Sequence, residues 1–354
     1  MMNLIIDKEN LLQFLRSKNV DSDLHKECLR LLKRQMHVIF NFDKQELLND
    51  KSFKEEVLEE LNMYGFLTGA GNSDQETSSF ESQILNRRTW KLLSSVLLLN
   101  DKNYINNNGL LIGRIGEEHK ILSSLFCNQK NYDLHTIFDI QKWENRSAWS
   151  KMTAHILPCT DIVITDRYIL KNSKEKLEHN LFYIFEKISK KYAELQINLV
   201  IFYDGFKIKE KKVVYRPKYT PIMEEITKEF KNKFGEKSNI TFVSYKHIFD
   251  ESLDETEKNS PHDRIIITNN RMFRSGDSFC YFDEEGKLKT EGKTLDVDSL
   301  ANSEAHSIAE SVRHDLQIIC KDNPYIFGDG KSNFIDFRNC RVRRHGYRKL
   351  KTNL

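Results

Sequence analysis

The chain has 354 residues, with 55 lysines and arginines against 52 aspartates and glutamates, so its formal net charge is only +3. This near-balance gives no global indication of a nucleic-acid partner, and only local basic clusters can point to one. The length predicts two domains, or one domain with a substantial extension. Hydrophobic residues make up 39% of the chain, which is enough to build packed cores.

Cysteine spacing and short motifs exclude several classes of protein. The six cysteines are scattered and form no CxxC pair, so we expect free thiols, no structural zinc and no disulfide framework. The sequence contains no signal peptide and no apolar run of membrane-spanning length, which predicts a soluble cytoplasmic protein with no membrane partner. Walker, GxGxxG, HExxH and GxSxG motifs are also missing from the sequence, so we expect no cofactor and no metal.

Residues 1–130 predict a mainly helical N-terminal domain. Asp7 is the predicted N-cap of a first amphipathic helix, and Asp21 or Ser22 opens a second. The segment that follows, 37–42, fits either a strand or the end of that helix. Three further helices are predicted, and they carry no catalytic pattern. Their apolar faces fit a core or an interface with a protein partner. These three predicted helices span 52–63, 80–100 and 116–127.

From about residue 135 the pattern changes to alternating strands and helices. This alternation predicts an α/β domain over residues 131–325, with a central sheet and covering helices. Residues 326–354 are predicted to form a basic C-terminal tail. The expected elements of the domain are strands 161–169, 198–203 and 240–245 and helices 175–195, 221–234 and 299–321.

The stretch 261–282, PHDRIIITNNRMFRSGDSFCYF, gathers polar chemistry on one predicted hairpin. Its β-branched run predicts a strand, and Asn269-Asn270 predicts a tight turn. His262 and Arg264 are two positions apart, so their side chains point to the same face of the strand. The partner strand returns Gly276 and Ser278 towards them.

The spacing of this stretch resembles the HKD motif of the phospholipase D superfamily. That motif is His-x-Lys, four residues, Asp, six residues and Gly-Ser or Gly-Gly; here Arg264 replaces the lysine and Asn269 replaces the aspartate. The chain is more similar still to the phospholipase-D-like domain at the C-terminus of MIT-domain proteins. Those domains share HDR, an upstream I-x-D-x-Y-I strand and an asparagine-leucine helix start, which match 164–169 and 180–182. The resemblance covers roughly residues 150–290.

The resemblance implies a phospholipase-D-like α/β sandwich with a phosphate-type site. In the superfamily a histidine like His262 attacks phosphorus, and Arg264 keeps the positive charge that holds phosphate oxygens. Gly276 and Ser278 would contact the phosphate, whereas Asn269 loses the orienting carboxylate. The pair Asp166 and Arg167 ends a predicted strand, where open α/β sheets bind ligands, although a structural ion pair fits equally well.

Catalysis in this superfamily uses two histidine motifs, and the chain has no second His-x-Lys or His-x-Arg motif with the same spacing. A nuclease with a phosphohistidine intermediate would therefore require a homodimer that brings two copies of His262 together. The alternative is a recognition module for nucleic acid or a protein partner. The changed lysine and aspartate favour recognition, while the intact histidine, glycine and serine spacing favours the nuclease.

A basic cluster near the C-terminus adds a candidate nucleic-acid surface. Clustered arginine and lysine side chains bind DNA or RNA phosphates and release counterions, although a solvated charge run fits the same pattern. The resemblance further implies a role in bacterial defence against phages or mobile elements, and the Asn-, Lys- and Ile-rich composition suits an AT-rich bacterial genome. The cluster comprises Arg341, Arg343, Arg344, Arg348, Lys349 and Lys351.

Overall fold

The described residues form two compact units. One unit lies within residues 1–136, 269–271 and 298–309, and the other within 137–268, 272–297 and 310–354. Each unit has its own sheet, so the protein is a mixed α/β protein. The computed structural model describes residues 1–17, 21–42, 95–100, 109–209, 212–215, 219–245, 264–289, 294–321, 323 and 325–343.

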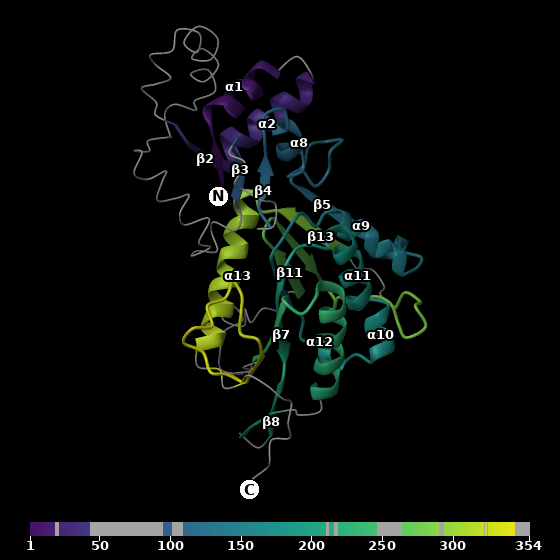
Figure 1. Ribbon diagram of the computed structural model, residues 1–354. Helices are drawn as coiled ribbons and strands as arrows, with labels where there is room; N and C mark the ends of the chain where they lie inside the picture. Colours follow the sequence, from purple (N-terminus) through teal and green to yellow (C-terminus); the bar gives the residue numbers. More distant parts are fainter. Residues whose placement is uncertain are drawn as a thin grey trace, which may run out of the picture. The chain divides into compact units, whose positions relative to one another are not determined.

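The first unit is built, over its described residues, on a parallel sheet of four strands in the order β2-β1-β3-β4. Helices α1, α2 and α8 accompany this sheet (Figure 1). The side chains of Asp7 and Asp21 accept hydrogen bonds from the backbone of Asn10 and Leu24, so both predicted N-caps are confirmed. The elements are β1 (Met2–Ile6), α1 (Lys8–Arg16), α2 (Ser22–Gln35), β2 (Met36–Phe40), β3 (Ser95–Leu98), β4 (Leu111–Gly113) and α8 (Glu118–Ser123).

The expectation of a mainly helical domain missed this sheet. Residues 95–98 were expected within a helix over 80–100, and they form β3 instead. All four of these residues are buried, and a short, continuously apolar run fits a buried parallel strand as well as a helix. The open choice at 37–42 is decided in favour of a strand, β2. The helix expected at 52–63 lies outside the described residues.

The second sheet contains nine strands, counted over the described ranges, in the order β15-β14-β10-β7-β6-β11-β12-β13-β5. Strands β6, β7 and β10 run parallel, and β11 is antiparallel to β6. The strands are β5 (His135–Asp139), β6 (Asp161–Thr165), β7 (Asn198–Asp204), β10 (Asn239–Tyr245), β11 (Arg264–Thr268), β12 (Arg271–Ser275), β13 (Thr294–Ser299), β14 (Ile326–Gly328) and β15 (Val342–Arg343). A separate antiparallel pair is formed by β8 (Phe206–Lys209) and β9 (Lys212–Tyr215).

The helices of this region alternate with its parallel strands. Helices α11 and α12 lie side by side (Figure 1). The helix expected at 175–195 is two helices, α10 and α11, which are separated at His179 and Asn180. The helices are α9 (Trp149–Ala154), α10 (Lys174–Glu178), α11 (Leu181–Lys191), α12 (Thr220–Phe234) and α13 (Ser303–Lys321), with 3-10 turns η3 (Ile140–Lys142), η4 (Arg146–Ala148) and η5 (Ile169–Lys171).

Two predicted regions of the second sheet have different outcomes. The hairpin is confirmed, because β11 pairs antiparallel with β12 and the chain turns at Asn269 and Asn270. The expected basic tail begins inside the sheet: β14 pairs with β10, and β15 pairs with β14. None of the helices in the described part of the chain is both long and apolar enough to cross a membrane.

A buried arginine holds the end of α8. Arg271 is 1% exposed, and its guanidinium donates hydrogen bonds to the carbonyl oxygens of Ser124 (2.7 Å), Leu125 (3.0 Å) and Phe126 (3.3 Å). It also donates to Ser299 Oγ at 2.8 Å. These carbonyls belong to the C-cap Ser124 and the two residues that follow it, where helical hydrogen bonding has ended, so Arg271 supplies the donors that they need.

Replacing Arg271 with methionine is therefore expected to lower the free energy of unfolding by about 3 kcal/mol, since buried carbonyls lose a charged donor. Arg274→Met is the control, because the Arg274 side chain is 35% exposed and lies 4.0 Å from Asp296; it should cost less than about 1 kcal/mol. Urea unfolding of both variants measures the difference, and equal losses would contradict the assigned role of Arg271.

A histidine pair joins two helices of the first unit. His25 Nδ1 of α2 lies 2.9 Å from His119 Nε2 of α8, and Phe14 packs against both rings. Burial lowers the pKa of His119 below its ordinary value of 6.5, with Asp21 acting in the opposite direction. At this distance one nitrogen must accept a hydrogen bond, so the pair requires at least one neutral ring.

A lowered folded-state pKa means that His119 contributes stability that is complete above pH 6.5 and is lost as the pH falls through the folded-state value. We expect wild type to lose stability between pH 7 and pH 5, and His119→Gln to lose less over the same range. His37→Gln is the control, because His37 is exposed and lies 3.3 Å from Asn3 Oδ1. Chemical unfolding at a series of pH values tests this, and parallel pH profiles for wild type and His119→Gln would count against it.

Candidate functional site

Several of the predicted site residues meet at one edge of the second sheet. Strands β6 and β7 are parallel, so their carboxyl ends lie at the same edge. Strand β11 is antiparallel to β6 and pairs Ile265 with Thr165, so β11 begins at the edge where β6 ends. Sequence-distant segments therefore converge at this edge, the kind of position where open α/β sheets bind ligands.

Asp166, directly after β6, is the centre of this edge. Its carboxylate is 1% exposed and accepts hydrogen bonds from Ser278 Oγ (2.6 Å), Phe279 N (3.0 Å) and Tyr168 N (2.9 Å). Burial raises the pKa of Asp166, and these hydrogen bonds and the charge of Arg264 act against that rise. The carboxylate thus ties the end of β6 to the segment that follows β12.

Arg264, the first residue of β11, reaches across the hairpin. Its Nη1 donates to the carbonyl oxygen of Gly276 at 2.5 Å. Its guanidinium carbon lies 5.4 Å from the centre of the Tyr168 ring. The remaining donors of the guanidinium give this half-buried side chain capacity to hold an anion.

Tyr168 has two further cations over its ring. Arg167 has its guanidinium carbon 5.6 Å from the ring centre, and Lys171 has its Nζ at 4.3 Å. Lys171 Nζ also lies 3.5 Å from Asp204 Oδ2 at the end of β7. Cations over an aromatic face are attracted by its quadrupole, so the ring draws positive charge to this edge of the sheet.

Buried contacts hold the Gly276–Phe282 segment in place. The Tyr281 hydroxyl donates to Ser275 Oγ at 2.6 Å, and its ring stacks on Trp149 at 4.9 Å. Ser275 Oγ in turn accepts from Asp277 N at 3.2 Å. Asn180 binds both backbone groups of Phe282, accepting from its N–H at 3.0 Å and donating to its carbonyl at 2.8 Å. The loop that carries Ser278 is therefore held by side chains from outside the hairpin.

The predicted residues are only partly brought together. Arg264, Gly276, Ser278 and Asp166 meet, with Arg167 beside Tyr168. Asn269 does not join them, because it is fully buried in the turn at the other end of β11. Asn269 is five positions after Arg264, and a strand rises about 3.3 Å per residue, so Asn269 lies about 16 Å from Arg264 along the strand.

The structure differs from the prediction for Ser278, and it describes only part of the predicted basic cluster. The Ser278 hydroxyl was expected to contact a phosphate, but it donates its hydrogen bond to Asp166. Arg341 and Arg343 are exposed, and the guanidinium carbon of Arg343 lies 5.5 Å from the Tyr325 ring centre and 6.0 Å from that of Phe327. His262, Arg344, Arg348, Lys349 and Lys351 lie outside the described residues.

The sequence patterns did not single out Lys171, Tyr281 or Ser275, and Tyr168 entered only as part of the motif match at 164–169. Tyr168 and Lys171 follow β6 within six residues, and this proximity to a strand end was the available signal. The contacts of Tyr281 and Ser275 depend on side-chain packing, for which a short motif carries no signal.

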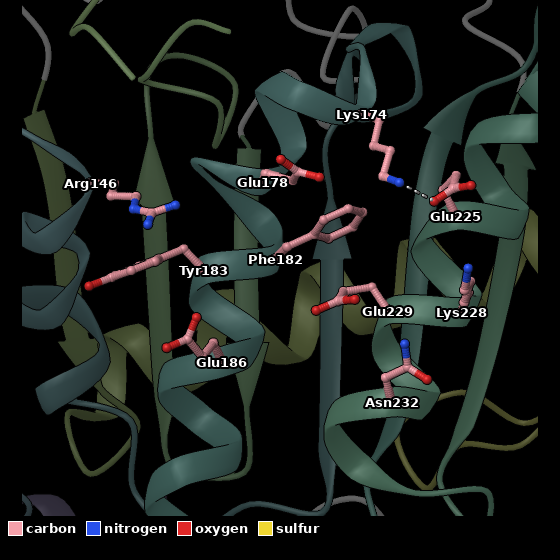
Figure 2. A pocket seen from close by; sticks show the side chains of 10 residues that line it. All are labelled: Arg146, Lys174, Glu178, Phe182, Tyr183, Glu186, Glu225, Lys228, Glu229 and Asn232. Atoms are coloured by element: carbon pink, nitrogen blue, oxygen red, sulfur yellow. Dashed lines mark ion pairs between the residues drawn. The ribbon is translucent and has the colours of Figure 1, made fainter. Parts of the chain in front are cut away.

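A separate hollow of about 390 Å³ lies on the helices α10, α11 and α12. Figure 2 shows its lining side chains, with Lys174 of α10 paired to Glu225 of α12 at 3.3 Å. Arg146 has its guanidinium carbon 5.3 Å from the Tyr183 ring centre. The lining residues do not include any of the predicted site residues, and they comprise both acidic and basic groups.

The described residues contain no group of three or more His, Cys, Asp or Glu side chains that is arranged to hold a metal ion. The cysteine at this edge, Cys280, is buried, and burial raises the pKa of its thiol to about 12. A thiol with that pKa is protonated at neutral pH, and the thiolate is the nucleophilic form.

Comparison with known proteins assigns no family. No protein-family model and no curated protein sequence matches the chain. Among solved structures, the chain is similar to Marinitoga piezophila Argonaute, whose crystal structure is in complex with 5′ OH guide RNA. The identity is 12% and the TM-score is 0.18, over 92% of this chain and 50% of that chain. The chain thus spans half the length of that protein, and a TM-score of this size supports no conclusion about fold or function.

Asp166→Ala is expected to lower the free energy of unfolding by about 3 kcal/mol, because it leaves buried backbone donors of Tyr168 and Phe279 without an acceptor. Ser278→Ala removes a single donor and should cost about 1 kcal/mol. Asp296→Ala, which removes a partly exposed carboxylate 4.0 Å from Arg274, serves as the control and should be nearly neutral. Urea unfolding ranks the three variants, and an Asp166→Ala protein as stable as Asp296→Ala would disprove the anchoring role.

Proposed function

We propose that this protein is a phospholipase-D-like recognition module that binds nucleic acid through a phosphate-type site. The observation that carries the proposal is the position of Arg264, which lies at the edge of the sheet beside Gly276 and over Tyr168. An arginine presents its donors in a planar fork that matches the oxygens of a phosphate. Arg167 and Lys171 add positive charge at the same place.

Several features support recognition in preference to catalysis. The motif position expected to hold lysine is Arg264, and the position expected to hold aspartate is Asn269, which lies in the hairpin turn. Ser278 uses its hydroxyl hydrogen on Asp166. These residues suit a rigid site that holds a phosphate, and they provide no group that would orient a histidine for attack.

The basic segment near the C-terminus supports the same proposal. Arg341 and Arg343 are exposed, and exposed arginines are available to contact phosphates. A place in bacterial defence against phages or mobile elements belongs to the proposal through the family resemblance. If nucleic acid does not bind, we propose that the module recognises a protein partner instead.

A homodimeric nuclease with a phosphohistidine intermediate is the second candidate. The intact spacing of His262, Arg264, Gly276 and Ser278 favours it. In this mechanism one histidine attacks phosphorus and the other protonates the leaving oxygen. Each chain supplies one such motif, so activity would depend on the association of two chains.

The recognition proposal predicts that Arg264→Gln weakens binding of oligonucleotides about tenfold, which corresponds to about 1.4 kcal/mol. Arg274→Gln is a matched control, because it removes an arginine from the same hairpin and should leave binding unchanged. Fluorescence anisotropy with single- and double-stranded DNA and RNA makes the measurement. Failure of the wild type to bind any of these ligands would refute nucleic-acid recognition.

Two further measurements distinguish a recognition module from a nuclease. Solution mass and nuclease assays are run on the wild type and on His262→Ala. A monomer that cleaves nothing while binding is retained supports recognition, whereas a dimer whose cleavage is abolished by His262→Ala establishes the nuclease.

A further inference from the structure

We infer that the site binds the phosphate backbone of nucleic acid without regard to base sequence, through Arg167, Lys171 and Arg264, which Tyr168 holds together. Arg167, Lys171 and Arg264 form the cation trio of this site. The inference rests on the proposed function, and it adds two residues, Tyr168 and Lys171, that the HKD-type spacing does not contain. It also assigns a mode of recognition, namely contacts to phosphates in preference to contacts to bases.

Three positively charged side chains lie around the Tyr168 ring. Within the described residues, the charged groups of the trio lie at 4.3, 5.4 and 5.6 Å from the centre of its ring. Like charges this close to a common point repel one another, and the cost is highest when no anion lies nearby. A ring quadrupole offsets part of that repulsion, and a bound polyanion offsets more.

Two neighbouring carboxylates, Asp166 and Asp204, offset part of the positive charge of the trio. Asp166 is buried and engaged by Ser278, Phe279 and Tyr168. Asp204 lies 3.5 Å from Lys171 Nζ, and the Lys171 side chain is 33% exposed. A flexible, partly exposed lysine can exchange an aspartate for a phosphate oxygen, so the Lys171–Asp204 pair keeps Lys171 close to the site before a ligand binds.

The occupied ring decides the mode of recognition. Proteins that bind bases directly offer an open aromatic face on which a base can stack. Tyr168 is partly buried and already has cations over its ring, so it is a poor stacking platform. Contacts between cations and phosphates fix register and affinity but carry no base information. Binding through this site is therefore sequence-independent and salt-sensitive.

The test measures binding of labelled DNA and RNA oligonucleotides of several sequences over a range of salt concentrations. Wild type should bind the sequences of one nucleic-acid type with similar affinity. Lys171→Gln should weaken all of them equally and reduce the slope of log K against log salt by about 0.7 for single strands. Lys142→Gln is the control, since Lys142 pairs with Asp139 and its side chain is 80% exposed; its slope should match wild type.

Tyr168 is a positioning residue, and its test uses a conservative rescue. Tyr168→Phe keeps the ring and should bind like wild type, whereas Tyr168→Leu should weaken binding to all sequences, with thermal unfolding confirming that both variants fold. If Arg264→Gln weakens binding but Lys171→Gln and Tyr168→Leu leave affinity and salt slope unchanged, the inference is overturned and the proposed function stands. A marked preference of the wild type for one base sequence also overturns it. If wild type binds no nucleic acid, the proposed function itself fails.

Discussion

The buried carboxylate of Asp166 is the interaction on which the candidate site depends. It accepts hydrogen bonds from both sides of the sheet edge, from Tyr168 after β6 and from Ser278 and Phe279 after β12. A buried carboxylate is costly to desolvate unless donors surround it, so the local chain must keep those donors in place. The same contacts set the positions of the Tyr168 ring and the Gly276 carbonyl, which together orient Arg264.

The direction of the strands explains why charge gathers at this edge. Because β11 is antiparallel to β6, the first residue of β11 lies beside the end of β6. Arg264 therefore meets Arg167 and Lys171, which are nearly a hundred positions away in the sequence. Tyr281 and Asn180 hold the returning loop, so the edge is rigid while Arg167, Lys171 and Arg264 are not fully buried. This edge is where we propose that a phosphate backbone binds.

Prediction from sequence succeeded where a pattern was local and failed where packing decided. The Asn269-Asn270 turn and the two aspartate N-caps were predicted correctly, because their hydrogen bonds and turn geometry involve neighbouring residues. The helix expected over 175–195 divides at Asn180, whose side chain binds Phe282. Residues 95–98 form a strand because β1 pairs with one edge of it and β4 with the other, and an apolar run alone cannot reveal such pairing.

The sequence by itself determined the α/β class, the hairpin and the identities of Arg264, Gly276, Ser278 and Asp166 as candidate site residues. These follow from alternating patterns, turn residues and spacing, all of which act over short distances along the chain. Only the tertiary structure decided that Ser278 serves Asp166, that Asn269 lies away from the cluster, and that Tyr168 and Lys171 belong to it. Asp166 and Ser278 are 112 positions apart, and their contact exists only because the order and direction of the strands bring both ends to one edge.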